Sequence, residues 1–293
     1  MRDDFCVFIL THGRPEKVET YRTLRSHGYT GHIFIVIDDE DETGDEYRKQ
    51  FGGDVLVFSK DEVSRYTDQF DNFKDRRTVL WARNACWDLA KQTGYRFFVQ
   101  LDDDYESWLY RRMGKGNRVS STDENEFHGW KINNLDLVFN ALVEIVETTP
   151  IKTIAFSQGG DHQGGRPKRN RFKRKAMNSF VCDTEKPFLF KGRINEDVNT
   201  YVSLGRTGEL FFTDMELQLN QRQTQTNSGG MTDVYLDSGT YVKSFYTIMV
   251  APSCVKIGLI GNINKRLHHQ INWDATAPLI MSEQSKNLSI KGT

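Results

Sequence analysis

The sequence lacks any long apolar run and contains little cysteine. No stretch approaches the roughly 18 apolar residues that a membrane-spanning helix requires, and the hydrophobic content of 38% is ordinary for a globular protein. The cysteines show no CxxC or other metal-ligand spacing. These absences argue against a membrane span and a cysteine-based metal site. Each cysteine lies in or beside an apolar segment, so we expect free, buried thiols at Cys6, Cys86, Cys182 and Cys254.

The amino terminus lacks the features of a signal peptide. Acidic residues precede its short apolar run, and no small-residue cleavage site follows. We therefore expect a first β-strand at this position and a cytoplasmic protein. A chain of 293 residues can form one large domain or two small ones, and we expect one domain with insertions.

The chain also lacks an excess of charge of either sign. Its net charge of −1 produces no overall field that would attract a polyanion. The local exception is RPKRNRFKRK at 166–175, whose basic residues are Arg166, Lys168, Arg169, Arg171, Lys173, Arg174 and Lys175. Like charges this dense repel each other and usually have an anionic partner, although a solvated charge run is the alternative. With glycines on its amino-terminal side, we expect a mobile basic loop at 158–178.

Apolar runs alternate with helical patterns in the first part of the chain. We predict strands at Phe5–Leu10, Ile33–Ile37, Val55–Phe58 and Tyr95–Leu101, with helices at Glu16–Ser26 and Thr78–Thr93. This alternation indicates an α/β fold with a mainly parallel central sheet flanked by helices. Ligands of such sheets bind outside the carboxyl ends of the strands. Three of these ends carry polar groups: THGR, DDED and DDD.

The second part of the chain continues with less regular elements. We predict a helix at Leu135–Thr148 and strands at Thr153–Phe156, Ser179–Cys182 and Glu209–Thr213, followed by a polar stretch and further apolar runs. We expect residues 1–110 to form a nucleotide-sugar-binding half and residues 111–293 to form an acceptor-binding half that contains the basic loop.

The sequence FFVQLDDDYE carries the strongest functional signal. An apolar strand delivers three aspartates to one edge, and alternation places Asp102 and Asp104 on the same side. A divalent ion held by such carboxylates can bridge adjacent phosphates and stabilise a leaving diphosphate. An acidic turn without a ligand is the alternative interpretation.

The order of the motifs resembles that of GT-A glycosyltransferases, in which a nucleotide-binding first strand precedes a helix with ARN (82–84 here) and a strand with a D-x-D motif. More closely, ILTHGRP, the IDDED turn, DNF-x-DRR, LDDDY, SGTYVKSFYTIMVAPS and LHHQINW resemble the glycosyltransferases encoded beside TET/JBP-type oxygenases in bacteriophages. The kinetoplastid base J glucosyltransferase is similar in kind. The match is densest at 7–110 and weaker at 179–280.

The resemblance implies transfer of a sugar from a nucleoside diphosphate sugar, expected to be UDP-linked, to the hydroxymethyl group of a 5-hydroxymethylpyrimidine in DNA, with 5-hydroxymethylcytosine as the expected base. It also implies a divalent metal (Mn²⁺ or Mg²⁺), a DNA-hypermodifying enzyme and, for a phage protein, the host cytoplasm. The basic loop would then contact DNA phosphates rather than read bases.

Carried over by position, the resemblance places the donor near residues of four segments. Asp104 would be the direct metal ligand, and Asp102 would contact the ribose or the metal. The expected donor contacts are Thr11, His12, Arg14, Asp38, Asp39, Arg83, Asp102 and Asp103. As ordinary protein residues, Arg83 and its neighbour Asn84 would lie on a helix surface, and DDED would form a solvated loop.

Two further elements complete the predicted site. The Asn195-Glu196-Asp197 sequence resembles the element that carries the catalytic base of inverting GT-A enzymes, and we favour Asp197 over Glu196; a helix amino terminus capped by Asn195 is the alternative. A late histidine completes the metal shell in many GT-A enzymes. His268 and His269 are candidates, of which an extended segment would present at most one, with a slight preference for His269.

Other functions remain open from the sequence. A glycosyltransferase acting on a glycan, lipid or protein shares the donor site, and a nucleic-acid-binding protein that has lost the donor site is another class. A metal-dependent nuclease also combines carboxylates with a basic loop. The sequence does not identify the sugar, the acceptor base or the oligomeric state.

Overall fold

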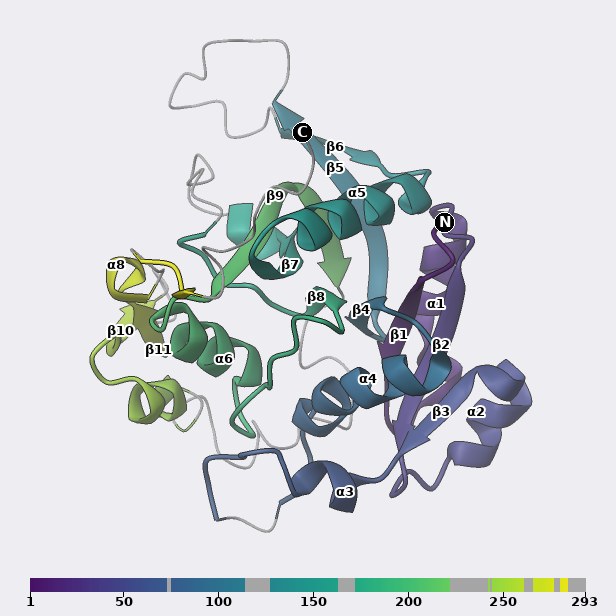
Figure 1. Cartoon of the computed structure of the whole chain (residues 1–293), viewed down its shortest axis with the longest axis horizontal. Coiled ribbons are helices and arrows are strands. Elements are labelled where there is room, and N and C mark those ends of the chain that lie inside the picture. The colour runs from purple at the N-terminus through teal and green to yellow at the C-terminus, as the bar shows by residue number, and fades with distance from the viewer. Residues whose placement is uncertain are drawn as a thin grey trace.

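The computed structural model describes residues 1–72, 75–113, 127–162, 172–221, 242, 244–260, 266–276 and 280–283. Nine strands form one sheet in the order β3-β2-β1-β4-β8-β7-β9-β5-β6 (Figure 1). These strands are β1 (Phe5–Leu10), β2 (His32–Asp38), β3 (Val55–Phe58), β4 (Phe97–Asp102), β5 (Tyr105–Met113), β6 (Phe127–Lys131), β7 (Ile151–Gln158), β8 (Ser179–Asp183) and β9 (Leu210–Gln221). The helices are α1 (Glu19–Ser26), α2 (Gly44–Phe51), α3 (Lys60–Ser64), α4 (Leu80–Thr93), α5 (Leu135–Thr148), α6 (Glu196–Gly205) and α8 (Trp273–Thr276).

The first half of the sheet is parallel. β1 pairs in parallel with both β2 and β4, and β3 pairs in parallel with β2. Because parallel strands share one direction, their carboxyl ends meet at one edge of the sheet, and Leu10 lies directly opposite both Val36 and Asp102 there. The predicted α/β class with a central sheet flanked by helices is therefore confirmed, and the THGR, DDED and DDD groups share this edge.

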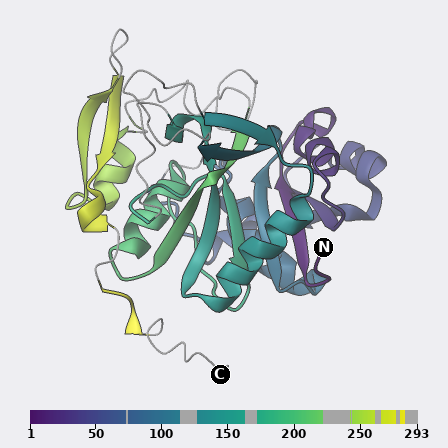
Figure 2. The ribbon, with the colours of Figure 1, turned by 90° about the horizontal axis from the view of Figure 1, so that it is seen from above.

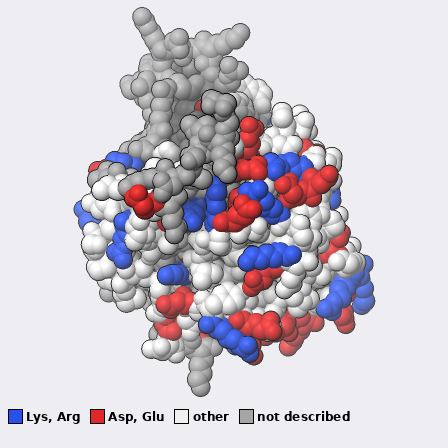
Figure 3. All heavy atoms as spheres, viewed as in Figure 1, with Lys and Arg blue, Asp and Glu red and all other residues white. Residues whose placement is uncertain are grey.

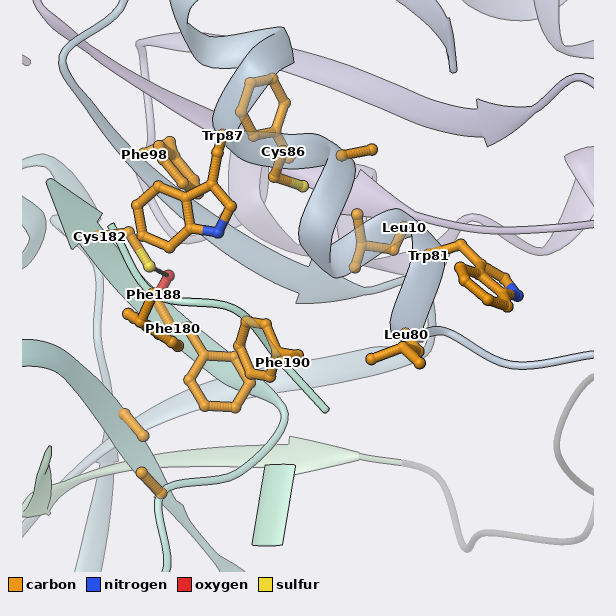
Figure 4. Packing of buried hydrophobic residues seen from close by; sticks show 14 of the residues in the cluster. Leu10, Leu80, Trp81, Cys86, Trp87, Phe98, Phe180, Cys182, Phe188 and Phe190 are labelled. Carbon is orange, nitrogen blue, oxygen red and sulfur yellow. Dashed lines mark hydrogen bonds between the residues drawn. The ribbon is translucent and has the colours of Figure 1, made fainter. Parts of the chain in front are cut away.

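Alternating side chains of β1 divide the core into two layers. Cys6, Phe8 and Leu10 pack with the helix α4, whereas Phe5, Val7 and Ile9 pack with α1 and α5 on the other face. Figure 4 shows the first layer, in which Trp87 and Cys86 of α4 face Phe98 of β4 and Phe180 of β8. Burial on both faces explains why the first strands appear in the sequence as continuous apolar runs.

The second half of the sheet is mixed. β8 runs antiparallel to β4 and β7, and β9 runs parallel to β7 but antiparallel to β5. The sequence did not predict β5 and β6, and it predicted only the start of β9, which continues through the polar residues to Gln221. These strands alternate polar and apolar residues, so they lack the apolar runs on which the prediction relied.

A separate two-stranded ribbon carries the last described strands. It consists of β10 (Val255–Ile260) and β11 (Arg266–Ile271), and residues 244–250 before it are helical. Figures 1 and 2 both place this ribbon on the opposite side of the molecule from β1–β3. In the described part of the chain, no helix is long and apolar enough to cross a membrane. The prediction of free, buried cysteines is confirmed for all four.

Candidate active site

The turn after β4 points Asp103 into the protein. Asp103 is 1% exposed, and its Oδ2 accepts hydrogen bonds from the Arg14 Nε at 2.7 Å and the Thr11 hydroxyl at 2.6 Å. A second bond joins Arg14 Nη2 to Asp103 Oδ1 at 2.8 Å, and the Thr11 hydroxyl also lies 2.8 Å from the Tyr47 hydroxyl. The side chains of Asp103 and Thr11 thus join the first strand end to the DDD turn, and their contact with the donor stays a prediction. Arg14 keeps one quarter of its side chain exposed while serving the same ion pair.

The helix α1 fixes the backbone of the same turn. The Thr20 hydroxyl donates to the Asp102 carbonyl at 2.7 Å and accepts from the Tyr105 N–H at 2.9 Å. The Thr20 N–H donates to the Asp103 carbonyl at 3.0 Å. One side chain and one peptide group therefore satisfy three backbone groups of the turn and hold the neighbouring carboxylates in place.

Asp102 and Asp104 each use one carboxylate oxygen in a hydrogen bond to another described side chain. Asp102 Oδ1 accepts from Arg83 Nη2 at 3.1 Å, and Asp104 Oδ1 accepts from Gln221 Nε2 at 2.9 Å. Burial and the charges of Asp102 and Asp103 raise the pKa of Asp104 to about 7. Burial likewise raises the pKa of Asp102, against the opposing effect of the Arg83 charge. The Oδ2 atoms of Asp102 and Asp104 have no hydrogen-bond partner among the described residues. A positive charge bound nearby would stabilise the ionised form of both carboxylates.

Arg83 joins the DDD turn to the NED element. Its side chain is 1% exposed, and its Nε donates to Glu196 Oε1 at 3.0 Å while Nη2 reaches Asp102. Burial alone lowers the pKa of Arg83, but the charges of Asp102 and Glu196 outweigh it and raise the pKa. Arg83 and Asn84 therefore do not lie on a helix surface. Arg83 contacts two carboxylates, and its burial argues against the predicted contact with the donor.

The NED element begins α6 at the same place. Asn195 occupies the N-cap position in the left-handed region (φ 56°), but its side chain bonds to the Thr247 hydroxyl at 3.1 Å instead of capping the helix. Glu196 is buried, and burial and the Asp197 charge raise its pKa. Asp197 is less buried, and its Oδ1 accepts from the Val198 N–H at 2.7 Å. Of the two acids, Asp197 is the more exposed.

The ends of β1 and β2 form a second polar group. His12 Nδ1 lies 2.8 Å from Asp38 Oδ2, and Lys60 Nζ lies 2.8 Å from Asp38 Oδ1. A hydrogen bond to the Asp38 carboxylate raises the pKa of His12. Asp38 is buried, whereas half of the His12 side chain is exposed. Asp39 is exposed and accepts from the Lys60 N–H at 3.0 Å. DDED is therefore tied into a network and is not simply a solvated loop, and His12 and Asp39 present the accessible atoms.

The charge balance of this region favours a bound cation. Arg83 interacts electrostatically with acids of both segments, and Arg14 with those of the DDD turn. Among the described residues, two guanidinium groups thus interact with five carboxylates, namely those of Asp102, Asp103, Asp104, Glu196 and Asp197. A divalent ion bound to the Oδ2 oxygens of Asp102 and Asp104 would offset the negative charge of these described carboxylates. Within the described residues, no three His, Cys, Asp or Glu side chains are grouped to hold a metal.

The two histidines lie in the β10–β11 ribbon rather than beside the DDD turn. In this ribbon His268 pairs with Gly258 and His269 with Ile257. Their rings stack with centroids 4.3 Å apart, so they do not point to opposite sides as expected from strand alternation. Neither histidine is grouped with Asp102 and Asp104 in this arrangement. The assignment of a late histidine to the metal stays a prediction.

Only part of the basic loop belongs to the described residues. Arg166, Lys168, Arg169 and Arg171 lie outside them, so the prediction for these four residues remains open. Lys173 pairs with Asp274, and Arg174 Nη2 contacts Asp161 Oδ1 at 3.2 Å. Lys175 Nζ lies 3.8 Å from the same Asp161 oxygen. Across the described surface in Figure 3, basic and acidic side chains are interspersed.

The sequence analysis missed several side chains that organise the site. Tyr47, Lys60 and Gln221 each bond to a predicted site residue. Lys60 follows the end of the predicted strand Val55–Phe58, so the carboxyl-end rule could have found it. Tyr47 lies on α2, which the sequence did not predict, and Gln221 ends a strand that extends further than expected.

The role assigned to Asp103 makes a prediction about stability. Asp103→Asn keeps the shape but removes the charge that pairs with Arg14, and breaking a buried ion pair costs on the order of 3 kcal/mol. Urea unfolding should show a free energy of unfolding lower by about this amount. Asp61→Asn, which alters an exposed acid, serves as the control and should change stability by less than about 0.5 kcal/mol. Equal stability of Asp103→Asn and the wild type would contradict the assignment.

One family model and several solved structures are similar to this chain. The model of the TET-Associated Glycosyltransferase family matches residues 5–230. Glucosyl-3-phosphoglycerate synthase from Mycobacterium tuberculosis in complex with Mg²⁺ and UDP is 11% identical, with 92% of this chain and 88% of that chain covered and a TM-score of 0.43. Its complex with Mn²⁺ and UDP-glucose is 12% identical, with 92% of this chain and 87% of that chain covered and a TM-score of 0.45. Similarity at this level does not bear on substrate or chemistry.

No curated protein matches the sequence. The family match extends over most of the chain and includes β1, the ARN helix, the DDD turn and the NED element. It confirms the resemblance inferred from these motifs. The chain is a member of the TET-associated glycosyltransferase family.

Proposed function

We propose that this glycosyltransferase transfers a sugar from a UDP-sugar to the hydroxymethyl group of a 5-hydroxymethylpyrimidine in DNA, with inversion and with the help of a divalent cation. The observation that carries the proposal is the Arg83 bridge, which joins the carboxylates of the DDD turn to the first turn of α6. A donor held by the first group thereby lies close to a base carried by the second.

The donor side of the proposal assigns Asp102 and Asp104 to the cation. Bound there, a divalent ion supplies charge that stabilises the diphosphate as the glycosidic bond breaks. Asp38 and Lys60 hold the His12 side chain at the end of β1. The exposed part of His12 and the Asp39 carboxylate would contact the nucleoside, since ligands of such sheets bind at the carboxyl ends of the strands.

The acceptor side assigns the catalytic base to Asp197. A hydroxymethyl oxygen is a poor nucleophile at neutral pH, so a carboxylate must accept its proton as the oxygen attacks the anomeric carbon. Glu196 is less suited because Arg83 engages its carboxylate in a buried ion pair. Attack opposite the diphosphate gives the inverted anomer. A base in a duplex must leave the stack to reach such a site, and phosphate contacts offset that cost.

One assay separates this proposal from its alternatives. UDP-glucose and Mn²⁺ are incubated with oligonucleotides that contain 5-hydroxymethylcytosine, 5-hydroxymethyluracil, 5-methylcytosine or cytosine, and UDP release is measured together with oligonucleotide mass. The proposal requires sugar addition to at least one hydroxymethylated oligonucleotide and to neither control. UDP release with glycan, lipid or protein acceptors alone would reassign the acceptor. Strand cleavage without UDP release would indicate a nuclease.

The basic loop provides a separate prediction about DNA. Replacing Arg166, Lys168, Arg169 and Arg171 by alanine should raise the DNA concentration needed for half-maximal rate, because each lost phosphate contact weakens binding. The salt dependence should flatten by up to about one logarithmic slope unit per lost contact. Lys173 and Arg174 are left intact because they already pair with acidic residues.

The control for the basic loop removes two exposed lysines elsewhere. Lys49→Ala with Lys91→Ala lowers the charge on α2 and α4 and should leave the DNA dependence nearly unchanged. Titrations of both variants at several salt concentrations give the comparison. Normal DNA dependence combined with a loss of donor affinity in the quadruple variant would instead identify the loop as a donor lid.

A further inference from the structure

Arg83 is enclosed on every side by groups that restrict its guanidinium. The side chain is 1% exposed, and the guanidinium carbon lies 5.0 Å from the centre of the Phe180 ring and 5.7 Å from that of Phe190. Its Nε and Nη2 atoms bond to different carboxylates, those of Glu196 and Asp102. Because the guanidinium is planar and rigid, these two bonds fix the angle between the two acids as well as their separation.

The backbone that carries Arg83 is fixed as well. The Gln100 side chain of β4 donates to the Arg83 carbonyl at 2.9 Å. The next residue, Asn84, accepts from the Phe190 N–H at 2.8 Å and donates to the Phe190 carbonyl at 3.0 Å. These bonds attach α4 both to the strand that ends in Asp102 and to the segment that leads to α6. Arg83 therefore joins the DDD turn to the start of α6. The backbone segments that lead to both of them are also hydrogen-bonded to α4.

The two carboxylates that Arg83 contacts belong to different parts of the proposed site. Asp102 lies in the DDD turn, and Glu196 directly precedes Asp197 in the first turn of α6. Arg83 itself is too buried to touch a donor or an acceptor. We propose that Arg83 is a positioning residue that couples the donor-binding carboxylates to the catalytic base, so that its two ion pairs act as one unit on the chemical step. This inference rests on the proposed roles of Asp102 and Asp197.

A double-mutant cycle tests the coupling. Arg83→Lys keeps the charge, but a single ammonium group cannot bond to Glu196 and Asp102 with the planar geometry of the guanidinium. Glu196→Gln keeps the shape but removes one ion pair. Each change should lower kcat by about tenfold or more, because a small misplacement of reacting groups is costly. The combined variant should be no slower than Arg83→Lys alone, whereas independent effects would multiply. The KM for the UDP-sugar should change by less than kcat does in each variant.

Arg96 supplies a matched control. It pairs with Asp183 and Glu147, and its guanidinium carbon lies 4.6 Å from the centre of the Phe97 ring, at the opposite end of β4 from the site. Arg96→Lys therefore perturbs a similar arrangement without reaching the carboxylates of the site. It should leave kcat within about twofold of the wild type, because these contacts lie at the far end of β4 from the DDD turn.

The outcomes separate the coupling from a purely structural role and from the proposed acceptor. Multiplicative losses in the cycle, or a lowered melting temperature with unchanged kcat, would overturn the coupling. If Arg83→Lys does not fold, Glu196→Gln alone decides, and an unchanged kcat overturns the inference. Wild-type activity on hydroxymethylated DNA is measured first. Its absence contradicts the proposed acceptor, and the same cycle is then measured by hydrolysis of the UDP-sugar, which uses the same donor site.

Discussion

Asp104→Asn is expected to lower kcat/KM for sugar transfer roughly 1000-fold, because an amide is a weaker ligand than a carboxylate and the loss of cation stabilisation costs several kcal/mol in the transition state. The fold should persist, since an asparagine oxygen can still accept the Gln221 hydrogen bond. UDP release and thermal unfolding measure the two effects separately. Activity should also disappear in EDTA and return with Mn²⁺ or Mg²⁺.

Glu106→Gln is the matched control for this variant. It makes the same acid-to-amide change on an exposed side chain of β5, two residues further along the chain. Its activity should remain within about twofold of the wild type, as for other exposed substitutions. Full activity of Asp104→Asn, or of the wild type in chelator, would remove Asp104 from the cation site.

Asp197→Asn is expected to lower kcat by about 10²–10⁴-fold, the usual contribution of a general base. Donor KM should change little, because the proposed role is proton acceptance rather than phosphate contact. The helix should still begin at the same residue, since the amide oxygen can accept the Val198 hydrogen bond. Single-turnover kinetics with saturating donor isolate the chemical step.

Asp136→Asn controls for the loss of an acid at a helix start. Asp136 is the second residue of α5, as Asp197 is of α6, but it bonds to Thr30 instead of lying near the DDD turn. Its kcat should equal that of the wild type even if stability falls slightly. Product analysis by NMR gives a second criterion for Asp197. Retention of the donor's anomeric configuration would exclude its role as the base of an inverting reaction.

The sequence predicted the parallel half of the fold well for a physical reason. Strands buried on both faces must be apolar throughout, so Phe5–Leu10 and Val55–Phe58 have the observed bounds. The helix Leu135–Thr148 also has the predicted bounds, because its buried residues recur at helical spacing. By contrast, β5 contains YESWLYRRM, in which a buried Trp108 alternates with more exposed residues. Its pairing with β9 depends on residues more than a hundred positions away.

The site was predicted as a set of residues but not as a set of contacts. Strand alternation predicted that the Asp103 side chain points away from those of Asp102 and Asp104. Nothing in the local sequence indicates, however, that Arg14 would neutralise Asp103. Arg83 is similar: a charged residue in a helix is usually exposed, and its burial depends on two acids from distant segments. His269 was assigned from its order in the chain, but its strand pairs with β10 in a separate ribbon.

The rate at which the four buried thiols react with an alkylating reagent can report how often the protein opens. All are free and inaccessible, and burial raises the pKa of Cys6, Cys86 and Cys182. Alkylating reagents require an exposed thiolate, so they can react only after the layer between α4 and the sheet opens. Because Cys86 lies three residues from Arg83 on the same helix, its labelling rate reports how often this helix leaves the sheet. A change in that rate can thus be compared directly with a change in catalysis for each substitution at the site.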